Sequence, residues 1–161
     1  MNKILNLLLV TLVLVLTSCR DEPEIPDHGK KGNPEKETAG TYVGTWSKAL
    51  RNSDDAPVEA QGSLILAATD ESYVTVVTID CASSEIGFND KSNFSSTDCR
   101  ANIINQSAQY VFYNVLPGNA FGTPFNGTVS FDGTATITFS KTIKEGRKTY
   151  TYDYTFSGTK Q

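Results

Sequence analysis

The sequence predicts an all-β protein: an antiparallel up-and-down barrel of about eight strands, preceded by a signal peptide and a flexible tether. Apolar and polar residues alternate with a period of two in short runs across residues 41–161, and no run has the spacing of an amphipathic helix. Turn-forming Gly, Asp and Asn separate these runs. Closing such a sheet into a barrel removes its exposed edges, and an open sandwich is the alternative.

The expected strands follow one another with short links. They cover residues 42–50, 61–68, 73–81, 101–106, 109–116, 128–131, 134–143 and 148–158. Asp132-Gly133 separates two of them and predicts a two-residue type I′ turn. In the third run one face carries Tyr73, Thr75, Val77, Ile79 and Cys81; in the last run one face carries Tyr150, Tyr152, Tyr154 and Phe156. We expect these faces to be covered by apolar neighbours.

Residues 1–18 have the pattern of a bacterial signal peptide. Residues 4–16 are almost wholly apolar, and as a helix they would span about 20 Å, too short for a hydrocarbon core of about 30 Å. The run ends in Leu-Thr-Ser-Cys at residues 16–19, which resembles the lipobox of bacterial lipoproteins. The resemblance implies that Cys19 carries a lipid and that the chain is cleaved between Ser18 and Cys19. An ordinary secretory peptide cut nearby is the alternative.

Residues 19–40 are expected to form the lipidated cysteine and a disordered linker. From residue 20 this stretch holds three prolines, three glycines and ten charged residues, a composition that cannot bury enough apolar surface to fold. Acidic residues at 21, 22 and 24 loosely resemble the surface-export signal of Bacteroidota lipoproteins. We therefore expect attachment to the outer membrane of the cell envelope, on its periplasmic or surface face.

Charge and residue types narrow the function of residues 41–161. Nine basic and twelve acidic side chains give a net charge of −3, which argues against nucleic-acid binding. The single histidine, His28, lies in the expected linker, so this domain has no Ser-His or Cys-His nucleophile pair. Phosphate-cradling loops and zinc-ligand spacing are also missing from the sequence. We expect no enzyme activity, no cofactor and no metal site.

Cys81 and Cys99 form an even pair once Cys19 is modified. In an oxidising compartment this predicts a disulfide closing residues 82–98, a stretch rich in Ser, Asn and Asp.

A family resemblance begins at Gly44-Thr45-Trp46, which matches the Gly-x-Trp motif in the first strand of lipocalins and other calycins. With the all-strand pattern and the C-terminal Phe-Ser-Gly-Thr-Lys of residues 156–160, the domain looks like the small lipocalin-like or calycin-like lipoproteins of Bacteroidota. The resemblance implies that Gly44 and Trp46 help close one end of the barrel. A basic residue covers the tryptophan in that family, and Lys160 is the positional match.

Two functions follow as hypotheses. A lipocalin-like barrel implies a binding module for a small hydrophobic ligand, which aromatic side chains would contact: Tyr110, Phe112, Tyr150, Tyr152, Tyr154 and Phe156. Packing of these side chains in a filled core is the competing interpretation. The second hypothesis is a protein-interaction lipoprotein, such as a protease inhibitor that uses loop 82–98 as a rigid insert.

Overall fold

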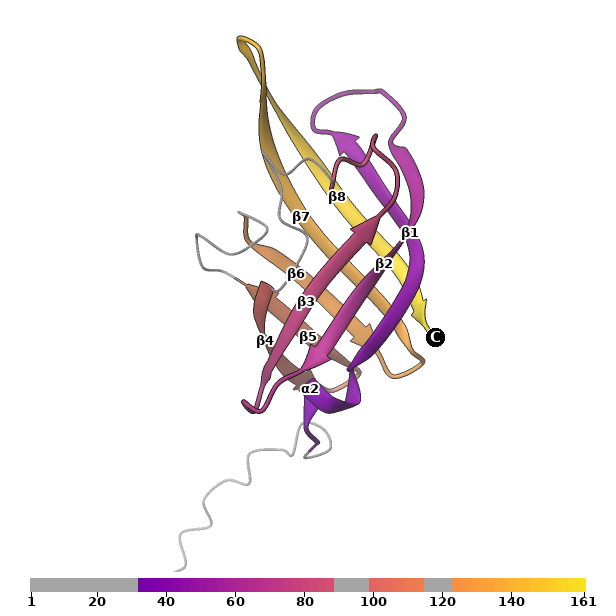
Figure 1. The fold of residues 1–161 in the computed structure, drawn as a ribbon, viewed down its shortest axis with the longest axis vertical. Coiled ribbons are helices and arrows are strands. Elements are labelled where there is room, and N and C mark those ends of the chain that lie inside the picture. Colours follow the sequence, from indigo (N-terminus) through magenta and orange to yellow (C-terminus); the bar gives the residue numbers. More distant parts are fainter. Residues whose placement is uncertain (1–31, 89–98, 115–122) are drawn as a thin grey trace, which may run out of the picture.

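The structure is a computed structural model and describes residues 32–88, 99–114 and 123–161. Eight antiparallel strands in chain order make a closed barrel, with each strand paired to the next and the last paired to the first (Figure 1). The predicted all-β, up-and-down architecture is confirmed.

The described elements are α2 (Pro34–Glu37), β1 (Gly40–Leu50), β2 (Val58–Ala68), β3 (Val74–Cys81), β4 (Cys99–Gln106), β5 (Gln109–Asn114), β6 (Phe125–Ser130), β7 (Thr134–Glu145) and β8 (Lys148–Lys160). The predicted face of β3 is buried, except that Tyr73 lies outside the strand and is exposed. β7 and β8 are the longest strands, and their hairpin projects beyond the rest of the barrel (Figure 1).

The turn between β6 and β7 differs from the prediction. It contains three residues, Phe131, Asp132 and Gly133, and the N–H of Gly133 donates to the carbonyl of Ser130 at 3.0 Å. Only Gly133 has a positive φ, 87°, whereas a type I′ turn needs positive φ at two positions. The predicted two-residue turn is wrong because Phe131 leaves the ladder and joins the loop.

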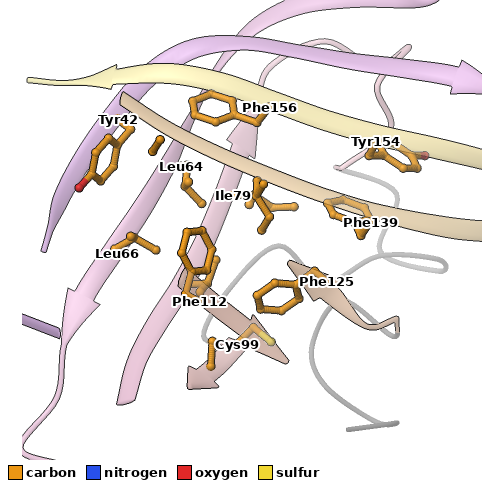
Figure 2. Close-up of a cluster of buried hydrophobic side chains, with 14 of the residues drawn as sticks. Tyr42, Leu64, Leu66, Ile79, Cys99, Phe112, Phe125, Phe139, Tyr154 and Phe156 are labelled. Atoms are coloured by element: carbon orange, nitrogen blue, oxygen red, sulfur yellow. The ribbon is translucent and has the colours of Figure 1, made fainter. Parts of the chain in front are cut away.

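The inward side chains pack into one hydrophobic cluster that runs through the barrel (Figure 2). Aromatic rings from several strands dominate it, among them Tyr42, Trp46, Phe112, Phe125 and Phe156, all 2 % exposed or less. This interior is a packed core of the protein's own side chains.

Glycine residues let β1 lie close to its neighbouring strands at Gly44. Gly44 pairs with Gly62 on β2 and with Gly158 on β8, so three glycines stand side by side. A Cβ on Gly44 would lie 2.1 Å from the carbonyl oxygen of Ser157, a distance that no real side chain tolerates. Strands β1 and β8 therefore approach closely only because Gly44 has no side chain.

A helix lies within residues 19–40, for which the sequence predicts a disordered linker. The α2 helix starts after Asn33, with Pro34 in its first turn. Proline fits there because the first N–H groups of a helix have no acceptor within the helix, so the absent N–H of proline costs nothing. Glu35 is 3 % exposed, and its carboxylate accepts a hydrogen bond from the N–H of Tyr73 at 3.2 Å. The expectation of a disordered linker up to residue 40 is wrong for this segment, because contacts with the barrel hold it.

The predicted signal peptide, Cys19 and most of the predicted linker lie outside the described residues. No helix within the described ranges is long and apolar enough to cross a membrane.

Candidate ligand-binding site at the α2 end of the barrel

The two ends of the barrel are closed by different segments. At one end α2 lies beside the β2–β3, β4–β5 and β6–β7 turns (Figure 1). At the other end the chain after β3 folds inward, where Ile86 and Phe88 are 0 % and 3 % exposed. The Phe88 ring meets Trp46 edge-on with centroids 4.6 Å apart. Phe88 thus plugs the mouth opposite α2.

A pocket of about 520 Å³ opens at the α2 end. It is lined by Glu37, Tyr42, Ser107, Tyr110, Val129, Ser130, Phe131, Gly133 and Lys160. These residues come from α2, β1, β5, β6, β8 and two turns, so only the closed barrel brings them together. The volume is in the range of small-molecule sites, and the mixture of aromatic rings and a few polar groups is typical of them.

Polar groups around the pocket are tied to α2. The hydroxyl of Tyr110 donates to Glu37 Oε2, and Lys160 Nζ donates to the Glu37 carbonyl at 3.2 Å. The hydroxyl of Tyr42 donates to the carbonyl of Thr38 at 2.7 Å. The N–H of Lys160 also donates to the carbonyl of Gly133 at 2.9 Å, which fixes the end of β8 against the β6–β7 turn. These contacts hold the lining in place before any ligand arrives.

Both phenols of the pocket stay protonated over the whole physiological range. Burial raises the pKa of Tyr42 to about 12. Burial, helped by the hydrogen bond to Glu37, also raises the pKa of Tyr110 to about 12. A phenol with such a pKa donates hydrogen bonds and is a poor general base near neutral pH. The arrangement suits recognition of a ligand better than acid–base chemistry.

The aromatic wall of the pocket is partly open to solvent. Phe131 is 59 % exposed, and its ring meets Tyr110 edge-on with centroids 5.2 Å apart. Val129 continues the apolar surface inward at 4 % exposure. The pocket therefore has an apolar wall that an incoming molecule can cover, and a charged rim at Lys160.

Of the six residues predicted to contact a ligand, only Tyr110 lines this pocket. Phe112 and Phe156 are fully buried in the core. Tyr154 is 2 % exposed, stacks on Phe139 at 4.9 Å and borders a second, more open hollow of about 370 Å³ where β6 begins. The last two, Tyr150 and Tyr152, lie half-buried on the projecting part of β8, where Lys48 Nζ sits 4.6 Å above the Tyr152 ring.

The structure does not bring Lys160 to Trp46. The β1–β8 register places Trp46 opposite Phe156 and Tyr42 opposite Lys160. Four residues of strand correspond to about 13 Å, so the expected cover of the tryptophan by the lysine is wrong. The aromatic residue opposite Lys160 is Tyr42, which is buried. Lys160 contributes to closing the α2 end through its bonds to Glu37 and Gly133.

The predicted disulfide between Cys81 and Cys99 is not formed, although both residues belong to the described part of the chain. Cys99 stands opposite Val77 on β3, whereas Cys81 lies four residues further along, about 13 Å away. A disulfide needs Cα atoms within about 7 Å. Both sulfurs are buried, and Cys81 Sγ lies 3.3 Å from the carbonyl of Gln61. The prediction fails because register separates the two cysteines.

Sequence reasoning missed most of the pocket. Glu37 fell in the expected linker, and Phe131 was assigned to a strand. One available signal was the position of Phe131 directly before Asp132-Gly133, because this dipeptide marks a turn and so places the ring at an end of the barrel. The described residues contain no group of His, Cys, Asp and Glu side chains arranged to hold a metal ion.

Comparisons with protein-family models, with curated proteins and with solved structures found no match to this chain. The pocket, its contacts and the sequence pattern of the N-terminus are therefore the basis for a functional assignment.

Proposed function

We propose that the protein is a lipid-anchored binding module of the bacterial cell envelope, without catalytic activity, and that its pocket at the α2 end takes a small amphipathic ligand. The observation that carries this proposal is the preformed pocket of about 520 Å³ beside a core that is filled by the protein's own side chains. A lipocalin-like barrel would hold its ligand inside. Here the packed interior moves the proposed site to the end of the barrel.

The lining indicates the chemistry of the ligand. Tyr110, Val129 and Phe131 offer an apolar wall for a ring or an acyl segment. Lys160 stands at the rim, and one of the three donors of its ammonium group is used by Glu37 within the described residues. Ser107 and Ser130 add hydroxyls. A molecule with an apolar body and an anionic head group matches these features.

The binding proposal can be tested with anilinonaphthalene sulfonate, a fluorescent probe with aromatic rings and one anionic group. We expect saturable binding to the full-length protein and a loss of affinity of about tenfold in Phe131→Ala, since a covered aromatic ring contributes on the order of 1 kcal/mol or more. Lys160→Gln should weaken binding by a similar factor, and the remaining affinity for the probe should no longer depend on the salt concentration.

Tyr73→Ala is the matched control, because Tyr73 is an exposed aromatic residue at the same end that does not line the pocket. Equal binding by wild type and Phe131→Ala, or equal weakening by Tyr73→Ala, would reject the pocket as the site.

The anchor is supported by the apolar run and by the Leu-Thr-Ser-Cys sequence at residues 16–19. Several acyl chains on one cysteine hold a protein stably at a bilayer, which one chain does not. In cells fed an alkyne fatty acid, the wild type should carry the label and sediment with outer membranes. Cys19→Ser should lose both properties. Membrane sedimentation of Cys19→Ser at the wild-type level would refute the anchor.

The alternative function, a protease inhibitor with loop 82–98 as its insert, loses its main support. The disulfide that would have made the loop rigid is not formed. In the described first part of loop 82–98, Ile86 and Phe88 are also buried in the core. The binding module is therefore the function that we put forward.

A further inference from the structure

We propose that the α2 end of the barrel rests on the surface of the lipid bilayer, with the rings of Tyr73 and Phe131 in the headgroup region. This inference depends on the lipid anchor proposed above and adds the orientation of the barrel to it. The pocket then opens towards the membrane, so its amphipathic ligand would come from the lipid phase.

Exposed apolar side chains gather at this end. Across the described residues, three large ones are strongly exposed: Val43 at 43 %, Tyr73 at 56 % and Phe131 at 59 %. Tyr73 lies just before β3 and Phe131 just after β6, in turns at the same end of the barrel (Figure 1). In the strand order the β4–β5 turn lies between these two turns, so the two exposed rings occupy different parts of the same barrel end. Aromatic side chains in such positions suit a membrane interface.

The exposed position of Tyr73 is maintained against its backbone preference. Its φ is 62°, in the left-handed region that disfavours residues with a Cβ. The N–H of Tyr73 donates to Glu35 at 3.2 Å, and its carbonyl accepts from the N–H of Ile103 at 2.9 Å. These contacts with α2 and β4 fix the turn, and the ring points away from the core instead of into it. Strain of this kind tends to persist where it serves a function.

The chain itself brings this end to the membrane. Twelve residues join Cys19 to Gly32, next to α2, and the distance between these two residues is at most about 45 Å when the chain is fully extended. A tether of this length keeps the α2 end at a high effective concentration near the bilayer, so even a weak aromatic contact is sufficient to orient the barrel.

Charges at this end favour apolar insertion over attraction to anionic lipid. Asp70 and Asp132 lie in the same turns as the aromatic residues, and Glu71 forms an ion pair with Arg100. These acidic turns are repelled by an anionic surface, whereas Lys160 at the pocket rim is attracted to it, so the two effects oppose each other. We therefore expect the contact to form on zwitterionic vesicles and to be no stronger on anionic ones.

Fluorescence quenching by brominated lipids tests the orientation. The lipidated full-length protein is reconstituted in phosphatidylcholine vesicles as Tyr73→Trp, as Phe131→Trp and as Thr149→Trp, an exposed position at the β7–β8 end. Trp46 is the only native tryptophan, is buried, and gives the same background in all three variants. Brominated lipid should reduce the added emission of the first two variants by about twofold and leave that of Thr149→Trp unchanged.

The possible results separate the two proposals. One outcome would overturn the orientation and leave the anchor intact: the protein floats with the vesicles, but brominated lipid quenches none of the three variants or quenches all three equally. Protein that fails to float with the vesicles would overturn the anchor and the orientation with it. A blue shift of Tyr73→Trp that depends on protein concentration and not on lipid would assign this face to a second copy of the chain, and would also overturn the proposal.

Discussion

Gly44 lies where the backbones of β1 and β8 approach each other closely. Its neighbours across the ladders are Gly62 and Gly158, and a Cβ would meet backbone atoms of Ser157 and Gly158 at 2.1 and 2.4 Å. Backbone atoms cannot yield as a flexible side chain can. Strands β1 and β8 would have to separate to accept even an alanine.

We expect Gly44→Ala to lower the free energy of unfolding by about 2–3 kcal/mol, the usual cost of forcing extra volume into a packed site. Urea denaturation of the full-length protein measures it. Ser157→Ala on the exposed face of β8 is the control and should stay within about 0.5 kcal/mol of wild type. A Gly44→Ala protein as stable as wild type would contradict the close approach.

Three tyrosines set the alkaline limit of stability. Burial raises the pKa of Tyr42, Tyr110 and Tyr154 to about 12, from an ordinary value of 10.0. The folded state keeps these protons at a pH where the unfolded chain has lost them. Their contribution to stability is therefore complete below pH 10.0 and is lost as the pH rises towards 12.

We expect the melting temperature to fall steadily across this interval. Spectrophotometric titration of tyrosinate in the folded protein should show Tyr42, Tyr110 and Tyr154 ionising late, near pH 12. Ionisation of all seven near pH 10.0 would show that these phenols are not buried as described.

At the level of elements, the alternation of apolar and polar residues with a period of two predicted the strands well. A strand with one buried and one solvent-exposed face must alternate in this way. The described starts of β2 and β6 were each missed by three residues. In β6 the missed residues include Asn126 and Gly127, which disfavour strands on their own. A Cβ on Gly127 would lie 2.0 Å from the Phe112 ring. Packing of that ring, invisible in the local pattern, accounts for glycine inside this strand.

The register between neighbouring strands could not be predicted from the sequence. Counting cysteines suggested a bridge, and a motif suggested that Lys160 covers Trp46. Both expectations require two particular residues to stand opposite each other. The ladders place Cys99 opposite Val77 and Lys160 opposite Tyr42. A shift of four residues moves a side chain by about 13 Å yet keeps it on the same face, so alternation alone does not detect it.

The α2 helix is an element whose stability comes from the barrel. It has four residues, too few to be stable alone. Glu35 connects it to the β2–β3 turn through the N–H of Tyr73. We expect Glu35→Ala to cost about 1–3 kcal/mol, because a part-buried N–H loses its acceptor. Lys36→Ala, on the exposed side of the same helix, should have little effect.

Hydrogen exchange of the full-length protein separates these cases. In Glu35→Ala the amides of the β2–β3 turn should exchange faster, while those of β7 and β8 stay protected. Unchanged protection at Tyr73 would contradict the role of Glu35 in holding α2.

For the whole molecule, the pocket could not be predicted because no single stretch contains it. Its lining comes from five elements and two turns that only barrel closure unites, and Glu37 lies in a segment whose composition suggests a linker. Closure also separates the two ends of the barrel. Phe88 fills one mouth, and the pocket with Phe131 occupies the other.

This separation predicts opposite effects for two phenylalanines. Phe88 is 3 % exposed and contacts the rings of Trp46, Phe139 and Tyr154. Phe88→Ala should cost about 3 kcal/mol or more in stability, the usual result of removing a buried ring, and should leave binding of anilinonaphthalene sulfonate at the α2 end unchanged. Phe131→Ala should weaken that binding and change stability by less than about 1 kcal/mol, since most of its ring is already in water. Urea denaturation and fluorescence titration of the same two proteins measure both quantities. If Phe88→Ala, assayed where it is still folded, lost the probe as well, the two ends would be coupled through the core, and the site could not be assigned to the α2 end alone.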